Sequence, residues 1–272
     1  MRYSIGEFAS ITGVTADTLR LYEKHNILRP LKDDHNKYRY FHDLDARNLL
    51  MSRWYRSMMI PLHDVSSLIN GGTMQQALGK LEESKHNLQE QLRKSTLLLN
   101  KINEIHTEIE QIRNRLRECQ IKSVPGRYRL KQTDQNRLLK EHALKQLVNE
   151  WMDLLPFTFF CFRIENWLEV LNQKELQYSW GVSLTEDDMR ALEVEENDYM
   201  EYLPPATCLT SVIYVSEKEP FGVSCFQFML DEIKAAGHLM NGDITGKILL
   251  NEYTEERGSY LEVNIPIQPA VA

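Results

Sequence analysis

The sequence predicts an α+β protein of several domains, in which one long helix separates a helical N-terminal domain from a C-terminal domain of mixed helices and strands. Residues 73–122 contain no proline and a single glycine, and their apolar side chains recur at steps of three and four, as one face of an α-helix requires. Short helical patterns precede this stretch, and strand-like and helical segments alternate after it. We therefore expect domains at residues 1–72, 73–122 and 123–272.

The long stretch is expected to form a dimerising coiled coil. Its clearest apolar seam, with steps of four and three, consists of Leu98, Ile102, Ile105, Ile109, Ile112, Leu116 and Cys119. A helix of about 50 residues would be roughly 70 Å long, which is too long to be buried inside one ordinary domain. The seam therefore predicts pairing with a second copy of the chain, that is, a homodimer.

The net charge of −7 is unevenly distributed along the chain. Residues 1–75 carry ten basic and eight acidic residues, and residues 76–124 carry nine and seven, so each segment has a net charge of +2. Residues 125–272 carry 13 basic and 24 acidic residues, a net charge of −11. This asymmetry indicates different partners for the two halves. The acidic half favours cationic ligands, although a solvated acidic surface explains the charge equally well.

Cysteine usage and hydropathy indicate a soluble, cytoplasmic protein with no membrane partner. The four cysteines are widely separated and form no CxxC pair. The N-terminal residues lack the apolar region of a signal peptide, and no run approaches 18 apolar residues.

A pair of short helices is predicted at the N-terminus. Ser4 and Glu7 have the spacing of a capping box, Gly13 suits the left-handed position after a helix, and Thr15 can cap the next helix. The second helix, from Ala16 to about Lys24, is expected to bury Leu19 and to expose Asp17, Thr18, Arg20 and Tyr22. By spacing alone, this polar face is also consistent with a simply solvated surface.

Residues 37–41 alternate basic and aromatic side chains after a polar turn, as the returning strand of a hairpin would. In such a wing, Lys37 and Arg39 can reach phosphates while the hydroxyl of Tyr38 donates to the DNA backbone. Two further helices follow, and the first of them carries Arg47 and Arg53 on its outer side.

Together these motifs resemble the MerR family. The resemblance rests on Tyr3-Ser4-Ile5-Gly6-Glu7-Phe8-Ala9, Gly13-Val14-Thr15, Thr18-Leu19-Arg20 with Tyr22-Glu23, Leu28-Arg29-Pro30 and Tyr38-Arg39-Tyr40. It implies a winged helix-turn-helix followed by a long antiparallel coiled coil in a dimeric transcription regulator. Two departures are Lys37, where the family usually has glycine, and Leu21, where many relatives have an aromatic residue.

The resemblance also implies which residues contact DNA. Arg20 and Tyr22 would do so from the recognition helix, with Asp17 and Thr18 beside them. Tyr38 and Arg39 would act from the wing, and Arg47 and Arg53 would add phosphate contacts.

In the C-terminal part, the order strand-helix-strand-strand is expected twice, which predicts an antiparallel sheet built of two similar halves. The expected strands are 127–130, 157–163, 178–183, 207–215, 248–254 and 259–267, with helices from Asp134 through Trp151 and at 220–236. This order, together with the last strand, resembles the GyrI-like effector-binding domain of multidrug-responsive regulators.

In that family a buried glutamate in an aromatic cleft neutralises lipophilic cations. The match to the last strand assigns this role to Glu262, which alternation places on one face with Tyr260 and Asn264. The candidate walls are Trp151, Phe160, Phe162, Trp167, Trp180, Tyr202, Tyr214 and Tyr253. Each of them singly fits core packing better than ligand contact.

The combined expectation is a regulator that distorts a promoter, so that RNA polymerase activates transcription, when a lipophilic, cationic small molecule binds. Two alternatives stay open. A metal- or redox-responsive regulator would use cysteines, of which Cys119 stands alone in the long helix, whereas Cys208 and Cys225 can still be considered a redox pair. A hydrolase fused to a DNA-binding domain lacks any recognisable catalytic motif. We therefore expect no enzyme activity, no metal and no other cofactor.

Overall fold

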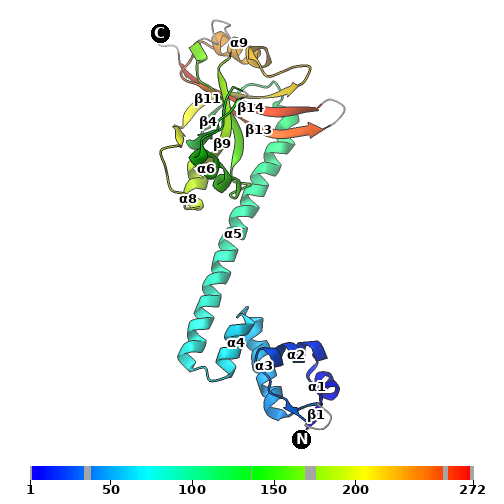
Figure 1. Cartoon of the computed structure of the whole chain (residues 1–272). Coiled ribbons are helices and arrows are strands. Elements are labelled where there is room, and N and C mark those ends of the chain that lie inside the picture. Colours follow the sequence, from blue (N-terminus) through cyan, green and yellow to red (C-terminus); the bar gives the residue numbers. More distant parts are fainter. Residues whose placement is uncertain (1, 34–37, 136, 169–175, 254–256, 270–272) are drawn as a thin grey trace. The chain divides into compact units, whose positions relative to one another are not determined.

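The computed structural model divides the chain into two compact units, residues 1–97 and 98–272. The described residues are 2–33, 38–135, 137–168, 176–253 and 257–269. Helix α5 (Met74–Arg115) contributes its first part to one unit and its last part to the other (Figure 1). Among the described residues, none of the helices combines the length and the apolarity needed to span a bilayer.

The N-terminal unit is a winged helix-turn-helix. Its first helices are α1 (Ile5–Thr12), α2 (Ala16–Lys24), α3 (Asp43–Ser57) and α4 (Leu62–Ile69). Strands β1 (Tyr3–Ser4), β2 (Leu31–Lys32) and β3 (Arg39–Phe41) form an antiparallel sheet in the order β1-β3-β2, in which β2 and β3 make the predicted wing. The core of the unit consists of Phe8, Ala9, Leu19, Tyr22, Ile27, Leu28, Phe41, Leu49, Ile60 and Val65.

The predicted ends of α1 and α2 are confirmed. The backbone N–H of Glu7 donates to the hydroxyl of Ser4 (3.4 Å), and the Glu7 carboxylate accepts from the backbone N–H of Ser4 (2.8 Å). Gly13 ends α1 with φ 67°, and the hydroxyl of Thr15 accepts from the N–H of Thr18 (3.1 Å). These local bonds satisfy backbone groups that each helix end leaves open, and they fix the turn between the two helices.

The long helix ends at Arg115, seven residues before the expected Lys122. Arg117 has a left-handed φ of 59°, and its N–H donates to the carbonyl oxygen of Val212 (2.8 Å). The chain thereby leaves the helix, and β4 (Gln120–Val124) pairs with β11 (Ala206–Ser216). The C-terminal sheet therefore begins within the segment that periodicity assigned to the helix.

Two seams with a three-and-four spacing run along α5, and only the outer one is mainly apolar. The inner seam faces the sheet and consists of Lys101, Ile105, Glu108, Ile112 and Arg115. Lys101 pairs with Asp188 (2.8 Å), Arg115 pairs with Glu262 (2.6 Å), and Ile112 is buried. The outer seam consists of Leu88, Leu92, Ser95, Leu99, Ile102, His106, Ile109, Arg113 and Leu116, and all of its leucines and isoleucines are exposed.

The expected single seam mixed these two sets. Ile105 and Ile112 belong to the inner seam, whereas Ile102, Ile109 and Leu116 belong to the outer one. Both seams have the seven-residue period and differ by only one residue in phase. Periodicity alone could not decide between them, because neighbouring positions on a helix both satisfy a three-and-four spacing.

The C-terminal unit is built on an antiparallel sheet. Its strands are β4, β5 (Arg127–Lys131), β8 (Phe159–Ile164), β9 (Tyr178–Thr185), β10 (Glu201–Leu203), β11, β13 (Ile244–Tyr253) and β14 (Arg257–Pro269). Among the described residues they lie in the order β10-β5-β9-β8-β13-β14-β11-β4, and β12 (His238–Met240) pairs with β14.

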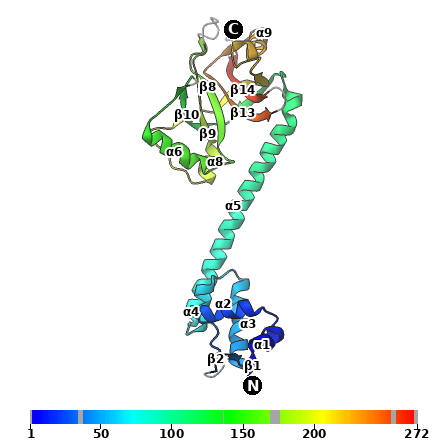
Figure 2. The ribbon, with the colours of Figure 1, turned by 45° about the vertical axis from the view of Figure 1, so that its right-hand side comes forward.

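The predicted pair of similar halves is confirmed. One half is β5, α6 (His142–Met152), β8 and β9, and the other is β11, α9 (Gln227–Ala235), β13 and β14. In one half, β5 pairs with β9 and β9 with β8; in the other, β11 pairs with β14 and β14 with β13. Strands β8 and β13 pair with each other and join the two halves. Figures 1 and 2 show α9 at one end of this sheet and α6 at the other.

The two faces of the sheet differ in chemistry. Leu261, Val263 and Ile265 of β14 belong to the apolar core that includes α9, and a second core joins α6 to β5 and β9. The alternating residues Glu262 and Asn264 are also buried, on the opposite face. The polar face of β14 is therefore covered by other parts of the unit, and Glu262 lies at a cleft.

Some expected elements differ from the structure. The helix expected from Asp134 begins only at His142, because β6 (Thr133–Asp134) and β7 (Arg137–Leu138) pair with each other before it. The helix expected from Pro220 consists of a 3₁₀ turn, η1 (Val223–Phe226), and α9. The short elements α8 (Glu186–Ala191), β10 and β12 had no recognisable pattern in the sequence.

Candidate functional site

The N-terminal unit contains a basic groove between α2 and the wing. Its charged side chains are those of Arg20, Glu23, Lys24, Arg29, Lys32 and Arg39. Five basic groups thus face one acidic group. A concave surface with this charge suits the phosphate backbone of a nucleic acid.

Glu23 connects α2 to the wing. Its carboxylate accepts a hydrogen bond from Arg39 Nε (2.6 Å) and lies 3.2 Å from the ammonium of Lys32. Burial alone would raise the pKa of Glu23, but the hydrogen bonds from Arg39 and Lys32 outweigh it and lower the pKa. The charged Glu23 therefore holds both strands of the wing against α2.

The predicted DNA-contacting residues of α2 occupy different environments. Asp17 and Arg20 are exposed and pair with each other (2.6 Å), and the hydroxyl of Thr18 lies 2.9 Å from that of Thr15 in the helix cap. Tyr22 is only 8% exposed and packs in the core beside Leu19. The expectation that Tyr22 is exposed is wrong, because a spacing of three residues places it on the buried side of α2 with Leu19.

The predicted residues outside α2 are also spread over the surface. Tyr38, Arg47 and Arg53 are exposed, and Arg53 Nη1 donates to the carbonyl oxygen of Thr12 (3.2 Å). Lys37 lies outside the described residues. Sequence reasoning missed Lys24, Arg29 and Lys32, which line the groove. Arg29 stands in the Leu28-Arg29-Pro30 motif, so that motif already contained a signal for it.

The C-terminal unit contains a cleft of about 450 Å³ between the last part of α5 and the sheet. Its apolar walls are formed by Ile105, Val124, Pro125, Leu155, Pro156, Phe157, Phe159, Phe160, Ile248 and Leu249. Its charged lining consists of Lys101, Glu104, Glu108, Lys122, Arg127, Lys247 and Glu262. The volume lies within the range of small-molecule sites, about 300–1,000 Å³.

Glu262 lies at this cleft but is already paired. Its Oε2 accepts hydrogen bonds from Arg115 (2.6 Å) and Lys122 (2.9 Å), and its Oε1 accepts from Asn264 (3.3 Å). Burial would raise the pKa of this carboxyl, which is 5% exposed, but the charges of Lys247 and Lys122 and the hydrogen bond from Arg115 lower it to about 2. Glu262 is therefore ionised and neutralised by the chain itself.

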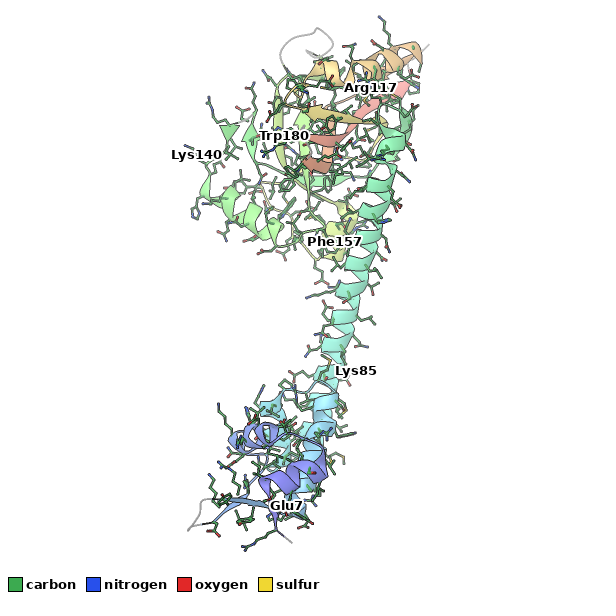
Figure 3. The ribbon with its side chains drawn as sticks, turned by 90° about the vertical axis from the view of Figure 1, so that its right-hand side faces the viewer. Glu7, Lys85, Arg117, Lys140, Phe157 and Trp180 are labelled. Carbon is green, nitrogen blue, oxygen red and sulfur yellow. The ribbon has the colours of Figure 1, made fainter. Side chains whose placement is uncertain are left out.

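Lysines cover two of the aromatic walls. The ammonium of Lys101 lies 5.9 Å from the ring centre of Phe157, and that of Lys247 lies 5.6 Å from that of Phe159. Lys247 also pairs with Glu108 of α5. Figure 3 shows Phe157 beside α5 and Trp180 farther along the sheet unit.

Two of the predicted ligand-binding residues, Glu262 and Phe160, line the cleft. The other predicted aromatic residues do not line it. Trp151 is 2% exposed in the core beneath α6. Phe162 packs in the other core, where an added Cβ on Gly246 would lie 2.4 Å from its ring, and Trp167 and Trp180 pack against the same core.

The three predicted tyrosines lie at separate places. The hydroxyl of Tyr202 donates to Glu186, the ring of Tyr214 lies 4.9 Å from that of Tyr260, and Tyr253 is 78% exposed. The composition of the predicted strands showed where aromatic residues occur along the chain, but not how the strands pair. The pairing register determines which of these side chains lie on the same surface.

The cysteines do not form the redox pair that the sequence left open. Cys208 is buried on the face of β11 near Arg127 and Lys122, whereas Cys225 packs against the core that contains α9. Burial raises the pKa of Cys208 to about 11, although the charges of Arg127 and Lys122 act in the opposite direction. All four cysteines are free thiols, and the described residues contain no cluster of metal-ligating side chains.

The match to a known family covers the part of the chain that forms the groove. Residues 4–41, which contain α1, α2 and the wing, match the model of the MerR family regulatory proteins. This stretch of the N-terminal unit is similar to the MerR family. The HTH-type transcriptional activators TipA of Streptomyces coelicolor and of Streptomyces lividans are 34% identical to it over 70 residues. These residues make up 26% of this chain, and the chain spans only 28% of the length of TipA.

Solved structures are similar to this chain at low sequence identity. EcmrR in its DNA complex is 16% identical, with 98% of this chain and 100% of that chain covered and a TM-score of 0.39. The EcmrR C-terminal domain is 9% identical, and the match covers 56% of this chain and 98% of that domain with a TM-score of 0.36. A hydrolase from Listeria innocua is 9% identical, with 60% and 97% covered and a TM-score of 0.35.

Proposed function

We propose that the chain is a ligand-responsive transcription regulator, whose N-terminal groove binds promoter DNA and whose C-terminal cleft binds a small effector. One observation carries the proposal: the helix that follows the MerR-type domain also forms a wall of the cleft. Lys101, Glu104, Ile105 and Glu108 of α5 line it. An effector in the cleft would therefore touch the helix directly.

The groove supports the DNA-binding part of this function. The recognition helix presents Arg20 and Lys24, and the wing presents Lys32 and Arg39, on one concave surface. Basic side chains on a helix and on an adjacent wing can hold two parts of a DNA backbone at once. The Glu23 contacts to Arg39 and Lys32 would keep this surface in shape before DNA binds.

The outer seam supports a homodimer. Its exposed leucines and isoleucines follow the seven-residue period of a coiled coil over residues 88–116. A single chain leaves these side chains in water, and a second copy of α5 would bury them. Each inner-seam residue is directly followed in sequence by an outer-seam residue, so that movement of one face of the helix would displace the other.

Coupling between effector and DNA then has a simple energetic form. The effector must bind one arrangement of α5 more tightly than another, since equal affinity for both would shift nothing. In this proposal the effector-bound dimer distorts the promoter and allows RNA polymerase to start transcription. The curated name of TipA, a transcriptional activator, agrees with this direction.

The sequence-based expectation for the effector is a lipophilic cation. The apolar walls of the cleft support the lipophilic part of that expectation. The charged part has less support, because Arg115 and Lys122 already neutralise Glu262.

The experiment is a mobility-shift titration on a DNA fragment that the wild-type protein selects from a random pool. Arg20→Ala is expected to weaken DNA binding at least tenfold. It should also reduce the slope of the logarithm of the binding constant against the logarithm of the salt concentration by about 1, as the loss of one phosphate contact would. Arg190→Ala, an exposed arginine of the C-terminal unit, is the matched control. Equal affinity of Arg20→Ala and the wild type would contradict the proposal.

A further inference from the structure

Arg127 is a buried cation at the wall of the cleft. It is 7% exposed, and its strand β5 lies between β9 and β10, where it pairs with Thr185 and Leu203. Within the part of the chain that the structure describes, its guanidinium has no hydrogen-bonding partner and no carboxylate within ion-pair distance. Burial lowers the pKa of this group, although the guanidinium of an arginine stays protonated.

The surroundings of Arg127 hold too few negative charges. Arg115, Lys122 and Arg127 all lie near the single carboxylate of Glu262, which is hydrogen-bonded to the first two. The next acidic residue of the lining, Glu108, is engaged by Lys247. Three cations therefore share one anion at this end of the cleft, and a buried charge without a counter-ion destabilises a fold.

The groups that would recognise a cation are already occupied. The carboxylate of Glu262 binds Arg115 and Lys122, and the rings of Phe157 and Phe159 face Lys101 and Lys247. A cationic ligand would have to displace these side chains. An anionic ligand would instead supply the missing counter-charge.

We propose that the cleft binds an amphipathic anion, with a carboxylate or similar group between Arg127 and Lys122 and an apolar body against Phe160, Ile248 and Leu249. The bidentate geometry of a guanidinium suits a carboxylate, and Lys122 is accessible enough to turn toward it. The apolar walls would bury the rest of the molecule. This inference names the effector class of the proposed function and rests on the cleft being its effector site.

The test compares two probes with tails of similar length, decanoate and decyltrimethylammonium, by isothermal titration of the full-length protein below micelle-forming concentrations. The wild type is expected to bind decanoate at least tenfold more tightly. Arg127→Met keeps much of the side-chain volume and removes the charge, so it is expected to lose at least tenfold in decanoate affinity. Its binding of decyltrimethylammonium should not weaken.

Two controls distinguish the loss of the anion site from the loss of the folded structure. Arg137→Met removes an exposed arginine on β7 and should change neither affinity. Without any probe, Arg127→Met should melt at or above the wild-type temperature, because it removes an unpaired buried charge. If Arg127→Met does not fold, Lys122→Met at its half-buried position provides the second variant, with a smaller loss of decanoate affinity.

The outcomes decide the inference independently of the proposed function. Equal or tighter binding of decyltrimethylammonium, no binding of either probe, or unchanged decanoate affinity in Arg127→Met and Lys122→Met would each overturn it. Promoter binding by unliganded Arg127→Met should equal that of the wild type. If the wild-type protein bound decanoate but no DNA, the regulator function would be refuted, whereas the anion site would still be supported.

Discussion

The paired carboxylate of Glu262 should make the stability of the C-terminal unit depend on pH in a defined window. Its pKa falls from an ordinary 4.5 to about 2 in the folded protein. Because the folded pKa is lower than the unfolded one, ionisation stabilises the fold above pH 4.5, and this contribution is lost as the pH falls toward 2. A pKa difference of about 2.5 corresponds to about 3 kcal/mol in the free energy of unfolding.

Glu262→Gln removes the charge and nearly keeps the shape of the side chain. At pH 7 we expect it to lower the free energy of unfolding by about 3 kcal/mol, since Arg115 and Lys122 then face each other without a counter-ion. The difference between wild type and variant should shrink steadily from pH 4.5 to pH 2. Other carboxyl groups titrate in both proteins and cancel in this difference.

The assay is urea denaturation followed by tryptophan fluorescence in a Trp54→Phe background. The protein has four tryptophans, and the remaining three lie in the C-terminal unit, so the signal reports on that unit alone. Lys122→Met serves as the partner variant, and the double variant gives the coupling energy of the pair. A difference below about 1 kcal/mol at pH 7, or one independent of pH down to 2.5, would refute the reasoning.

Three other substitutions test the packing. Trp151→Ala should destabilise the C-terminal unit by about 3–5 kcal/mol in urea denaturation followed by circular dichroism, because it empties a buried core position; a variant of normal stability would contradict the core assignment. Ile109→Lys should convert the dimer to a monomer in light scattering without lowering the melting temperature of the sheet unit, whereas Ile112→Lys should lower that temperature because Ile112 faces the sheet. A stable dimer of Ile109→Lys would exclude the outer seam as the interface.

Much of the N-terminal unit could be predicted because its signals are local. Ser4, Gly13 and Thr15 act on backbone groups within a few residues, and their roles follow from spacing alone. Tyr22 was the exception. Its position three residues after Leu19 places it on the buried side of α2, whereas the sequence reading assigned it to the exposed polar face.

The cleft could be predicted only in part, because it depends on contacts between distant residues. The last-strand motif located Glu262, but its partners Arg115 and Lys122 come from the end of α5 and from an unexpected strand. The register of β8 and β13 sends Phe162 into the core, whereas Phe157, just before β8, lies against Lys101 of α5 and Phe159 lines the cleft. No pattern within a single segment contains this information.

Ion pairs to α8 and to β14 fix the length of α5 between Lys101 and Arg115. Lys101 is tied to Asp188 near one end of this span and Arg115 to Glu262 at the other, about 21 Å apart along the helix axis. One inserted residue would turn the following side chains by about 100° and move them about 1.5 Å along the axis, so that only one of the two ion pairs could remain. Among related chains with this arrangement, we therefore expect substitutions but no insertions or deletions in these 15 positions.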